Sequence, residues 1–281
     1  MNRYRDIKLT KAQLKDLERV DAWLNGRPFR ESSRQKERDL TVPALSIEDV
    51  MAQYIPPAVK SSGQFFTPLE MSEYLYQQMF YSGILPLNVG ERILDPCGGI
   101  GHLLYHLPGY FDSSTVRLTV YELEQECVGI GQKLFPWANW RWAIPFECLN
   151  DIEGQYDLVV MNPPFGDVRR GMAAAELMSA GRAKLAEHLF LELAIRALKP
   201  NGVAVVIAPY NLLDKMPKAL RLWFDERAEL EEKSQDTLPG EFKLTKVRVH
   251  AYVIRRREPA AAVSFAPVSA LSSVQQMSLF G

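Results

Sequence analysis

Short apolar runs alternate with segments of helical periodicity through the centre of the chain. Short strands are predicted over 91–95, 116–122, 157–161 and 203–208. Helices are predicted where apolar residues recur every three or four positions, over 69–80, 123–134 and 187–198. A Lys-Pro-Asn-Gly stop signal follows the last helix, with Gly202 opening the next strand. Strands that alternate with helices predict an α/β fold with a doubly wound, mostly parallel sheet.

The two ends of the chain show other patterns. Thr10 with Gln13 predicts a capped helix that stops at Asn25–Gly26, and a second helix is predicted over 47–54. Near the other end, residues 244–256 alternate apolar and polar side chains, which predicts a long antiparallel edge strand. Beyond Pro259 no periodicity remains. We therefore expect three parts, namely a helical region, a main α/β domain and a flexible tail, over 1–60, 61–258 and 259–281.

Composition and charge narrow the class of protein. The 281 residues carry a formal net charge of −1, so the chain as a whole is not an electrostatic binder of nucleic acid. A local basic face that binds nucleic acid is still compatible with the basic stretches at 27–38, 169–170 and 255–257. Three cysteines without a CxxC pair favour neither a disulfide framework nor a zinc ribbon. No apolar run approaches a membrane span, and the first residues lack the apolar stretch of a signal peptide, so we expect a cytoplasmic protein without membrane contact.

Metal binding is not predicted. His102 and His106 stand four residues apart and could share a helix face, but neither Glu nor a third ligand accompanies them. We therefore expect both histidines on an ordinary helix surface.

The most informative segment is the apolar strand 157–161 that runs directly into Asn162-Pro163-Pro164-Phe165. This places the motif at the carboxyl end of a strand, where open parallel sheets bind ligands. The prolines supply no N–H, so carbonyl oxygens and the Asn162 amide oxygen are left as acceptors for an amino group, and Phe165 offers a flat face to a planar group. The motif is suited to activating a weakly basic exocyclic NH2 as a nucleophile.

A second motif follows the strand at 91–95. Asp95 ends this strand and is followed by a glycine-rich turn through Gly101, which is neither a Walker loop nor GxGxxG. An acidic residue facing the ligand favours a cationic group over a pyrophosphate. Glu122 ends the next strand, where a carboxylate accepts the hydroxyls of a ribose in dinucleotide folds.

Taken in order, these motifs resemble the S-adenosylmethionine-dependent N6-adenine DNA methyltransferases, the group that includes type I modification subunits. The resemblance covers about residues 61–256 and implies a seven-stranded Rossmann-like methyltransferase sheet. It implies catalytic roles for Asn162, Pro163, Pro164 and Phe165. It also implies that residues of five motifs contact the cofactor. The leading motif supplies Gln64, Phe65, Phe66, Thr67 and Pro68, and the glycine turn supplies Asp95, Cys97, Gly98, Gly99 and Gly101. Glu122 would bind the ribose, Asp151 would contact the adenine, and Asn162 of the catalytic motif would also contact the cofactor.

One residue of the turn departs from the family, because type I subunits usually carry a small hydroxyl residue or alanine where this chain has Cys97. Leu238-Pro239 with Phe242 also resembles the closing segment of the family. Large recognition domains are not visible in the sequence, so the target sequence stays open.

The resemblance favours methylation of adenine N6 in DNA, with S-adenosyl-L-methionine as cofactor and DNA as partner. The same acceptors also suit a glutamine amide in a protein or an RNA base, and a non-catalytic DNA- or partner-binding relative would keep the fold. Cytosine N4 is a further possible target.

The last residues carry one more motif. Gln276-Met277-Ser-Leu279-Phe280 resembles the pentapeptide with which bacterial replication and repair proteins dock on the DNA sliding clamp. By that resemblance Gln276 is a polar anchor, and the three apolar side chains fill subsites of the clamp.

Overall fold

The computed structural model describes residues 8–55, 65–111, 114–167, 183–242 and 247–258. The strands are β1 (Arg92–Asp95), β2 (Arg117–Glu122), β3 (Asn139–Trp142), β4 (Tyr156–Met161), β5 (Leu198–Pro209), β6 (Ala228–Lys233) and β7 (Val249–Arg256). The helices are α1 (Lys11–Leu24), α2 (Ile47–Gln53), α4 (Leu69–Tyr81), α5 (Gln125–Leu134), α6 (Leu149–Ile152), α7 (Ala186–Ala197) and α8 (Lys218–Arg227), with short 3-10 turns between some of them.

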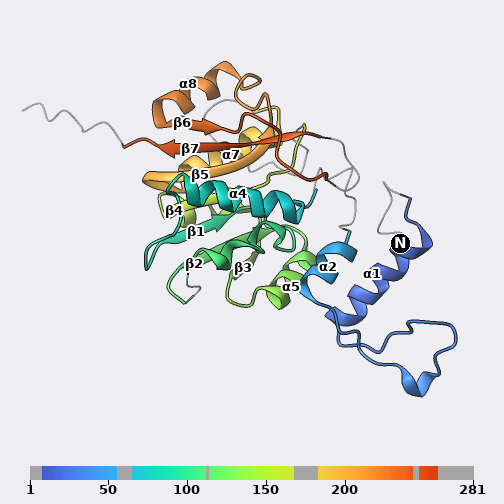
Figure 1. Ribbon diagram of the computed structural model, residues 1–281. Coiled ribbons are helices and arrows are strands. Elements are labelled where there is room, and N and C mark those ends of the chain that lie inside the picture. Colours follow the sequence, from blue (N-terminus) through green and yellow to red (C-terminus); the bar gives the residue numbers. More distant parts are fainter. Residues whose placement is uncertain (1–7, 56–64, 112–113, 168–182, 243–246, 259–281) are drawn as a thin grey trace, which may run out of the picture.

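The strands form one seven-stranded sheet in the order β3-β2-β1-β4-β5-β7-β6 (Figure 1). Strands β1 to β5 are parallel, and β7 runs antiparallel to both of its neighbours. The first strand, β1, lies in the middle of the sheet. β2 and β3 are added on one side of it and β4 and β5 on the other, so the order of the strands reverses between β1 and β4. That arrangement confirms the doubly wound, mostly parallel α/β sheet, and it creates the switch point at which such sheets bind ligands.

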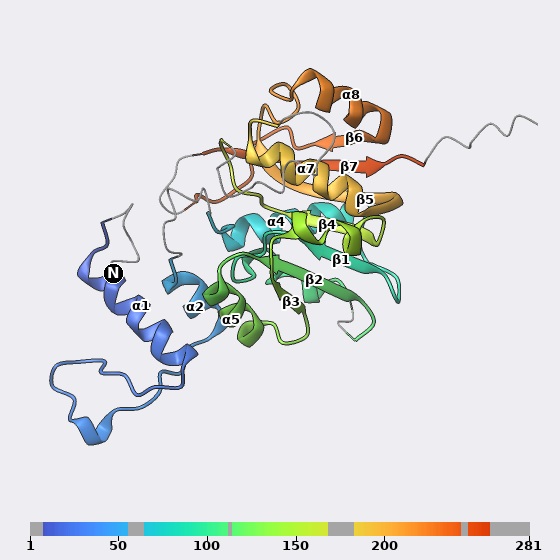
Figure 2. The same ribbon diagram turned by 180° about the vertical axis from the view of Figure 1, so that it is seen from behind.

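Helices cover both faces of the sheet, as Figures 1 and 2 show from opposite sides. Along each strand, neighbouring residues point to opposite faces, so that Ile93 belongs to the core shared with α4 and α5, whereas Leu94 belongs to the core shared with α6, α7 and α8. Val160 and Val159 divide in the same way. The nearly continuous apolar runs of the central strands therefore reflect burial on both faces.

The N-terminal helices pack on the main body. α1 has the predicted capping box, in which the Thr10 side chain accepts from the Gln13 backbone N–H. Trp23 of α1 and Val50 of α2 are buried in the same core as β1 and α4. The boundary predicted at residue 60 falls outside the described residues, as does the tail from 259, so this division of the chain stays a prediction.

Three features of the sheet differ from the sequence prediction. Strand β7 begins at Val249 and is not an edge strand, because β6 pairs with its outer side. β6 was missed because only two residues of its sequence, Ala-Glu-Leu-Glu-Glu-Lys, are apolar. Charged side chains are typical of an exposed edge strand, where they discourage pairing with another chain. β3 was missed as well, since only Trp140 is buried in its Asn-Trp-Arg-Trp sequence.

Strand β5 also begins earlier than predicted. It starts at Leu198, directly after α7, and passes through the expected stop signal. Asn201 adopts a left-handed backbone conformation there (φ 63°), and the pairing with β4 shifts register between Tyr156 and Leu158. The stop signal thus ends the helix and produces an irregularity within the strand.

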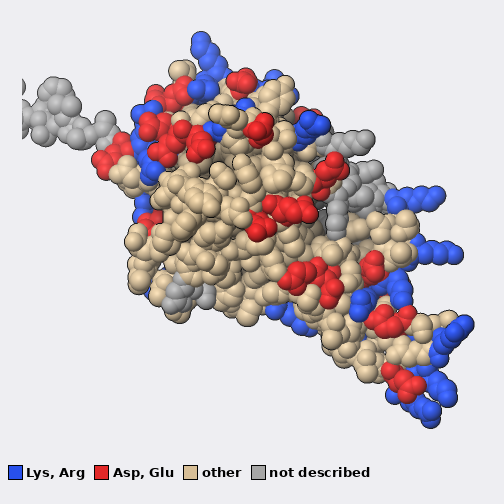
Figure 3. Space-filling model, viewed as in Figure 1, with Lys and Arg blue, Asp and Glu red and all other residues tan. Residues whose placement is uncertain are grey.

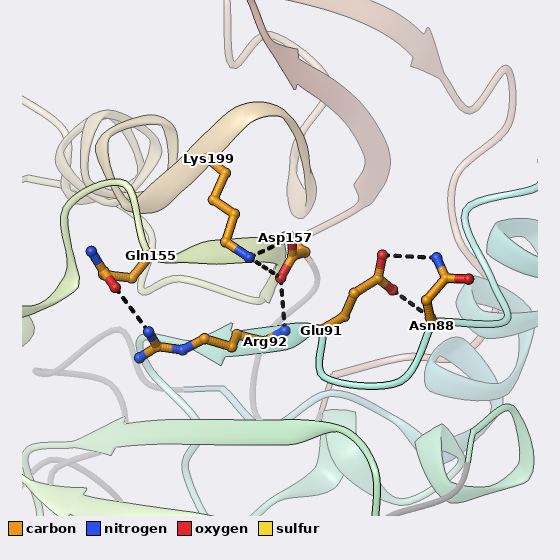
Figure 4. A network of polar contacts seen from close by, with 6 residues as sticks. All are labelled: Asn88, Glu91, Arg92, Gln155, Asp157 and Lys199. Atoms are coloured by element: carbon orange, nitrogen blue, oxygen red, sulfur yellow. Dashed lines mark hydrogen bonds and ion pairs between the residues drawn. The ribbon is translucent and has the colours of Figure 1, made fainter.

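A polar network connects the amino ends of β1, β4 and β5 (Figure 4). These strand ends lie opposite the carboxyl ends at which the switch point opens. The Asp157 carboxylate accepts from the Arg92 backbone N–H at 2.8 Å and from Lys199 Nζ at 2.7 and 2.8 Å. The Arg92 guanidinium donates to Gln155 at 2.9 Å. These contacts fix the relative positions of the strands whose other ends carry the site described next.

Candidate active site

The predicted site residues meet at the carboxyl ends of three neighbouring strands. Asp95 ends β1, Glu122 ends β2 and Asn162 directly follows β4. They line one cavity of about 420 Å³, within the usual range for small-molecule sites. The other predicted residues that line this cavity are Phe65, Phe66, Thr67, Cys97, Gly98, Gly99, Pro164 and Phe165.

The glycine turn after β1 is packed closely by the chain itself. A Cβ on Gly98 would lie 2.2 Å from Val120 Cγ1 on β2, and a Cβ on Gly99 would lie 2.7 Å from the Phe66 ring. Gly99 also has a left-handed backbone (φ 58°), which glycine adopts without a steric cost. The turn therefore requires glycine at these positions to bring the backbone against the cavity floor.

Two buried carboxylates lie at the base of the cavity. Asp95 accepts from the Cys97 backbone N–H at 3.0 Å, and Glu122 accepts from the backbone N–H groups of Gly99 and Glu124 at 2.9 and 2.8 Å. Burial raises the pKa of Asp95 and that of Glu122 to about 7 each, and the nearby charge of Glu122 adds to the shift of Asp95. A cation in the cavity would offset the cost of burying these charges.

The raised pKa values predict how stability depends on pH. The folded protein holds protons on Asp95 and Glu122 that the unfolded chain releases near pH 4, so their contribution to stability is present at low pH and is lost as pH rises towards 7. Thermal unfolding from pH 5 to 8 should therefore show a steeper fall of Tm in the wild type than in the neutral double variant Asp95→Asn, Glu122→Gln. Parallel curves would contradict the assignment of raised pKa values.

The Asn162 side chain is held by the segment that precedes α4. Its Nδ2 donates to the Phe65 carbonyl oxygen at 3.1 Å and to Thr67 Oγ1 at 3.0 Å. Its Oδ1 is buried and accepts no hydrogen bond from the described residues. The Cys97 thiol lies 3.5 Å from the Asn162 carbonyl oxygen and donates to it. Burial raises the pKa of this thiol well above its usual value, so Cys97 is a neutral donor and not a nucleophile.

Aromatic side chains form the wall around Asn162. The Phe66 ring stacks on His102, with ring centroids 4.6 Å apart. Phe242, from the segment predicted to close the site, meets Phe165 edge-on at 6.2 Å and lies 6.5 Å from Phe65. The leading, catalytic and closing segments thus share one aromatic cluster, although they lie far apart in the sequence.

Some predicted site residues lie elsewhere. Asp151 is exposed on α6 and does not line the cavity, so the structure does not bring the expected adenine-contacting acid to the site. Pro68 is the N-cap residue of α4 and Gly101 packs against Phe135, and neither lines the cavity. Pro163 does not line the cavity either. Gln64 lies outside the described residues.

Several cavity residues were not predicted. His102 was expected on a helix surface, but it is buried in a 3-10 turn, and its Nε2 lies 3.2 Å from the Met51 carbonyl oxygen of α2. A hydrophobic turn after β3 and the start of α7 add to the lining with Ile144, Pro145, Phe146, Ala186 and Phe190. The turn with Ile144, Pro145 and Phe146 was not predicted because it directly follows β3, and β3 itself was not predicted.

Comparison with known proteins identifies the relatives of the chain. The family model of the N-6 DNA methylases matches residues 46–133, and that of the Eco57I restriction-modification methylases matches residues 111–234. The methylase subunit of the type I restriction enzyme EcoEI from Escherichia coli is 23% identical over 171 residues, which cover 54% of this chain. By sequence, parts of the chain are thus similar to N-6 DNA methylases and to restriction-modification methylases. The chain spans about a third of the length of that curated relative, 34%.

Solved structures show the same methyltransferase fold. A putative class I S-adenosylmethionine-dependent methyltransferase from Listeria monocytogenes superposes with a TM-score of 0.58 at 14% identity, covering 90% of this chain and 83% of that protein. The type I restriction-modification methyltransferase subunit from Streptococcus thermophilus superposes with a TM-score of 0.55 at 19% identity, covering 71% of this chain and 47% of that one. The seven-stranded methyltransferase sheet expected from the sequence is therefore confirmed.

Two further expectations concern the C-terminal peptide and membrane-spanning helices. The peptide Gln276–Phe280 lies outside the described residues, so its binding to a sliding clamp stays a prediction. In the part of the chain that the structure describes, every helix falls short of the length and apolar character that crossing a bilayer requires.

Proposed function

We propose that this protein transfers a methyl group from S-adenosyl-L-methionine to the N6 amino group of adenine in DNA. One observation carries the proposal: the Asn162 amide is fixed through its nitrogen while its buried oxygen accepts no hydrogen bond from the described residues, beside two buried carboxylates in the same cavity. An unsatisfied acceptor there suits an amino group, and the carboxylates suit a cation.

The cavity fits the cofactor by the chemistry of its lining. S-adenosyl-L-methionine supplies an electrophilic methyl group on a sulfonium cation. We assign Asp95 to the methionine end, because a buried carboxylate suits the cationic group there. We assign Glu122 to the ribose hydroxyls, because an acidic residue at the end of the second strand binds the ribose in dinucleotide folds. Since Asp151 does not line the cavity, we assign the adenine ring to the apolar turn that contains Pro145 and Phe146.

The target amino group would be bound by the catalytic motif. Asn162 accepts one of its hydrogens, a backbone carbonyl next to the prolines accepts the other, and Phe165 stacks on the base. Both hydrogen bonds would favour a tetrahedral nitrogen, whose lone pair would form the new N–C bond as the methyl–sulfur bond breaks and the thioether leaves. The methylated nitrogen would then release one proton to solvent, so the residues of the motif contribute orientation and polarisation. A base in duplex DNA must leave the stack to reach this depth.

A basic surface on the N-terminal part of the chain supports DNA as the partner. Residues 8–42 carry nine Lys and Arg against six Asp and Glu, whereas the whole chain has a net charge of −1. Figure 3 shows Lys and Arg gathered at the end of the molecule formed by α1 and the loop after it. We name residues 26–41 the arm; a bridge between Phe29 and Thr41 closes its base. The helices that carry the arm contact the cavity wall, since α2 meets His102.

The arm has cations that are free to meet phosphates. Within the described residues, Arg27 pairs with Asp21 and Arg38 with Asp39, whereas Arg30, Arg34 and Lys36 are exposed and form no ion pair. Replacing these three residues by alanine should weaken DNA binding and reduce the slope of log affinity against log salt by up to about 0.9 per lost phosphate contact. Titrations at several salt concentrations measure the slope. The matched control replaces Lys215, Lys218 and Arg221 near α8; an equal change in both triple variants would exclude a specific role for the arm.

An assay with labelled methyl groups separates the candidate functions. Purified protein with labelled S-adenosyl-L-methionine should transfer label to DNA, and it should transfer little to RNA or protein. Label on RNA or on a protein glutamine would favour those acceptors instead, whereas cofactor binding without any transfer would favour a non-catalytic relative. The Asn162→Ala variant serves as the negative control for transfer to each acceptor.

A further inference from the structure

The orientation of the Asn162 amide is set by residues of the segment 65–67, which lies 95 to 97 positions earlier in the chain. Both hydrogen bonds of Nδ2 go to this segment, to the Phe65 carbonyl at 3.1 Å and to Thr67 Oγ1 at 3.0 Å. An amide nitrogen has two hydrogens, so the segment satisfies it completely.

The two acceptors have different effects on the amide. The Phe65 carbonyl oxygen only accepts, so a flipped amide would place its own oxygen against another acceptor. Phe65 therefore decides which way the amide faces. The Thr67 hydroxyl could donate or accept; its contribution is to satisfy the second N–H at a position where Thr67 is only 3% exposed.

The segment is itself fixed in the cavity wall. Phe66, between the two acceptors, packs against Gly99 so closely that a Cβ there would lie 2.7 Å from its ring, and it stacks on His102. Thr67 is followed directly by Pro68 at the start of α4. The acceptors for the amide are thus held by packing on both sides.

We propose that Thr67 is a positioning residue that, together with the Phe65 carbonyl, holds the Asn162 amide oxygen available for the amino group of the target. This rests on the proposed function. It gives Thr67 a role beyond the cofactor contact that the family resemblance implies, because its Oγ1 accepts from Asn162 Nδ2. It also links the two halves of the site, since Phe65 and Thr67 line the cavity assigned to the cofactor while they orient the residue assigned to the target.

Kinetics of two matched variants test the proposal. Thr67→Val keeps the shape and removes the acceptor, so kcat should fall by about 10²-fold, with the cofactor Kd within about threefold of the wild type. Thr67→Ser keeps the hydroxyl and should restore kcat to within about threefold of the wild type. Thr119→Val on β2, outside the cavity lining, controls for the loss of a threonine hydroxyl elsewhere. A weakened cofactor Kd with unchanged kcat in Thr67→Val would overturn the proposal and restore the cofactor role.

A second measurement does not depend on activity. In protein with 15N-labelled asparagine, the side-chain amide signal of Asn162 is assigned by its loss in Asn162→Ala. We expect one of its two protons to exchange with solvent about tenfold faster in Thr67→Val than in the wild type, and at the wild-type rate in Thr67→Ser. Equal exchange in wild type and Thr67→Val would exclude the hydrogen bond. If exchange follows the expected pattern while the wild type methylates no DNA, the proposed function fails and the positioning role of Thr67 stands.

Discussion

Replacing Asn162 by alanine should reduce the rate of methyl transfer by about 10²–10³-fold while cofactor binding largely survives. The variant removes the amide oxygen, which is the preorganised acceptor for the target amino group. It leaves Asp95 and Glu122 in place, and these carboxylates are the expected anchors of the cofactor. Single-turnover transfer and calorimetric titration measure the two effects separately.

The matched control for this variant is Asn139→Ala, because Asn139 is exposed on β3 and lies outside the cavity lining. It should transfer methyl groups at the wild-type rate. Turnover near the wild-type level in Asn162→Ala would exclude Asn162 as the acceptor. A large loss of cofactor affinity in that variant would show that Asn162 belongs mainly to the cofactor site.

Neutralising either buried carboxylate should weaken cofactor binding by about 10- to 100-fold, because each variant removes charge-assisted contacts from a desolvated site. The variants are Asp95→Asn and Glu122→Gln. In the wild type, affinity should rise between pH 6 and 8, since the carboxylates, with a pKa of about 7 in the free protein, lose the protons that compete with a cation. Calorimetry in two buffers of different ionisation enthalpy would detect this proton release.

Asp151→Asn is the matched control for both carboxylate variants. The family resemblance gives Asp151 a cofactor contact, whereas the structure places it exposed on α6, outside the cavity lining. We expect its cofactor affinity to be unchanged. Unchanged affinity in Asp95→Asn and Glu122→Gln would mean that the cofactor binds elsewhere, and a loss confined to Asp151→Asn would support the family assignment over the observed geometry.

The centre of the fold could be predicted because burial on both faces leaves a clear trace in the sequence. The runs 158–161 of β4 and 203–208 of β5 are apolar without interruption, and β1 contributes the buried pair Ile93 and Leu94. The margins of the sheet were harder to predict. β3 and β6 are short and largely exposed, so their sequences show neither a continuous apolar run nor a sustained alternation of apolar and polar residues. β6 pairs with β7 and takes the edge position of the sheet, and this pairing is a tertiary contact that the local sequence does not reveal.

The site could be predicted where a motif directly follows a buried strand. Asp95, Glu122 and Asn162 come together because they occupy the ends of adjacent parallel strands, and strand ends can be located from the pattern. The supporting contacts could not be predicted in this way. The stacking of His102 on Phe66 and the hydrogen bonds from Asn162 to Phe65 and Thr67 join segments whose proximity exists only in the folded chain.

The central claim, methylation of adenine N6 in DNA, is tested most directly by identifying the modified nucleoside. Genomic DNA from a methylation-free host that expresses the wild-type chain would be digested to nucleosides and analysed by mass spectrometry, beside DNA from the same host expressing Asn162→Ala. We expect N6-methyldeoxyadenosine in the wild-type sample and its absence in the variant sample. N4-methyldeoxycytidine in its place, or no methylated nucleoside above the level of the variant, would contradict it.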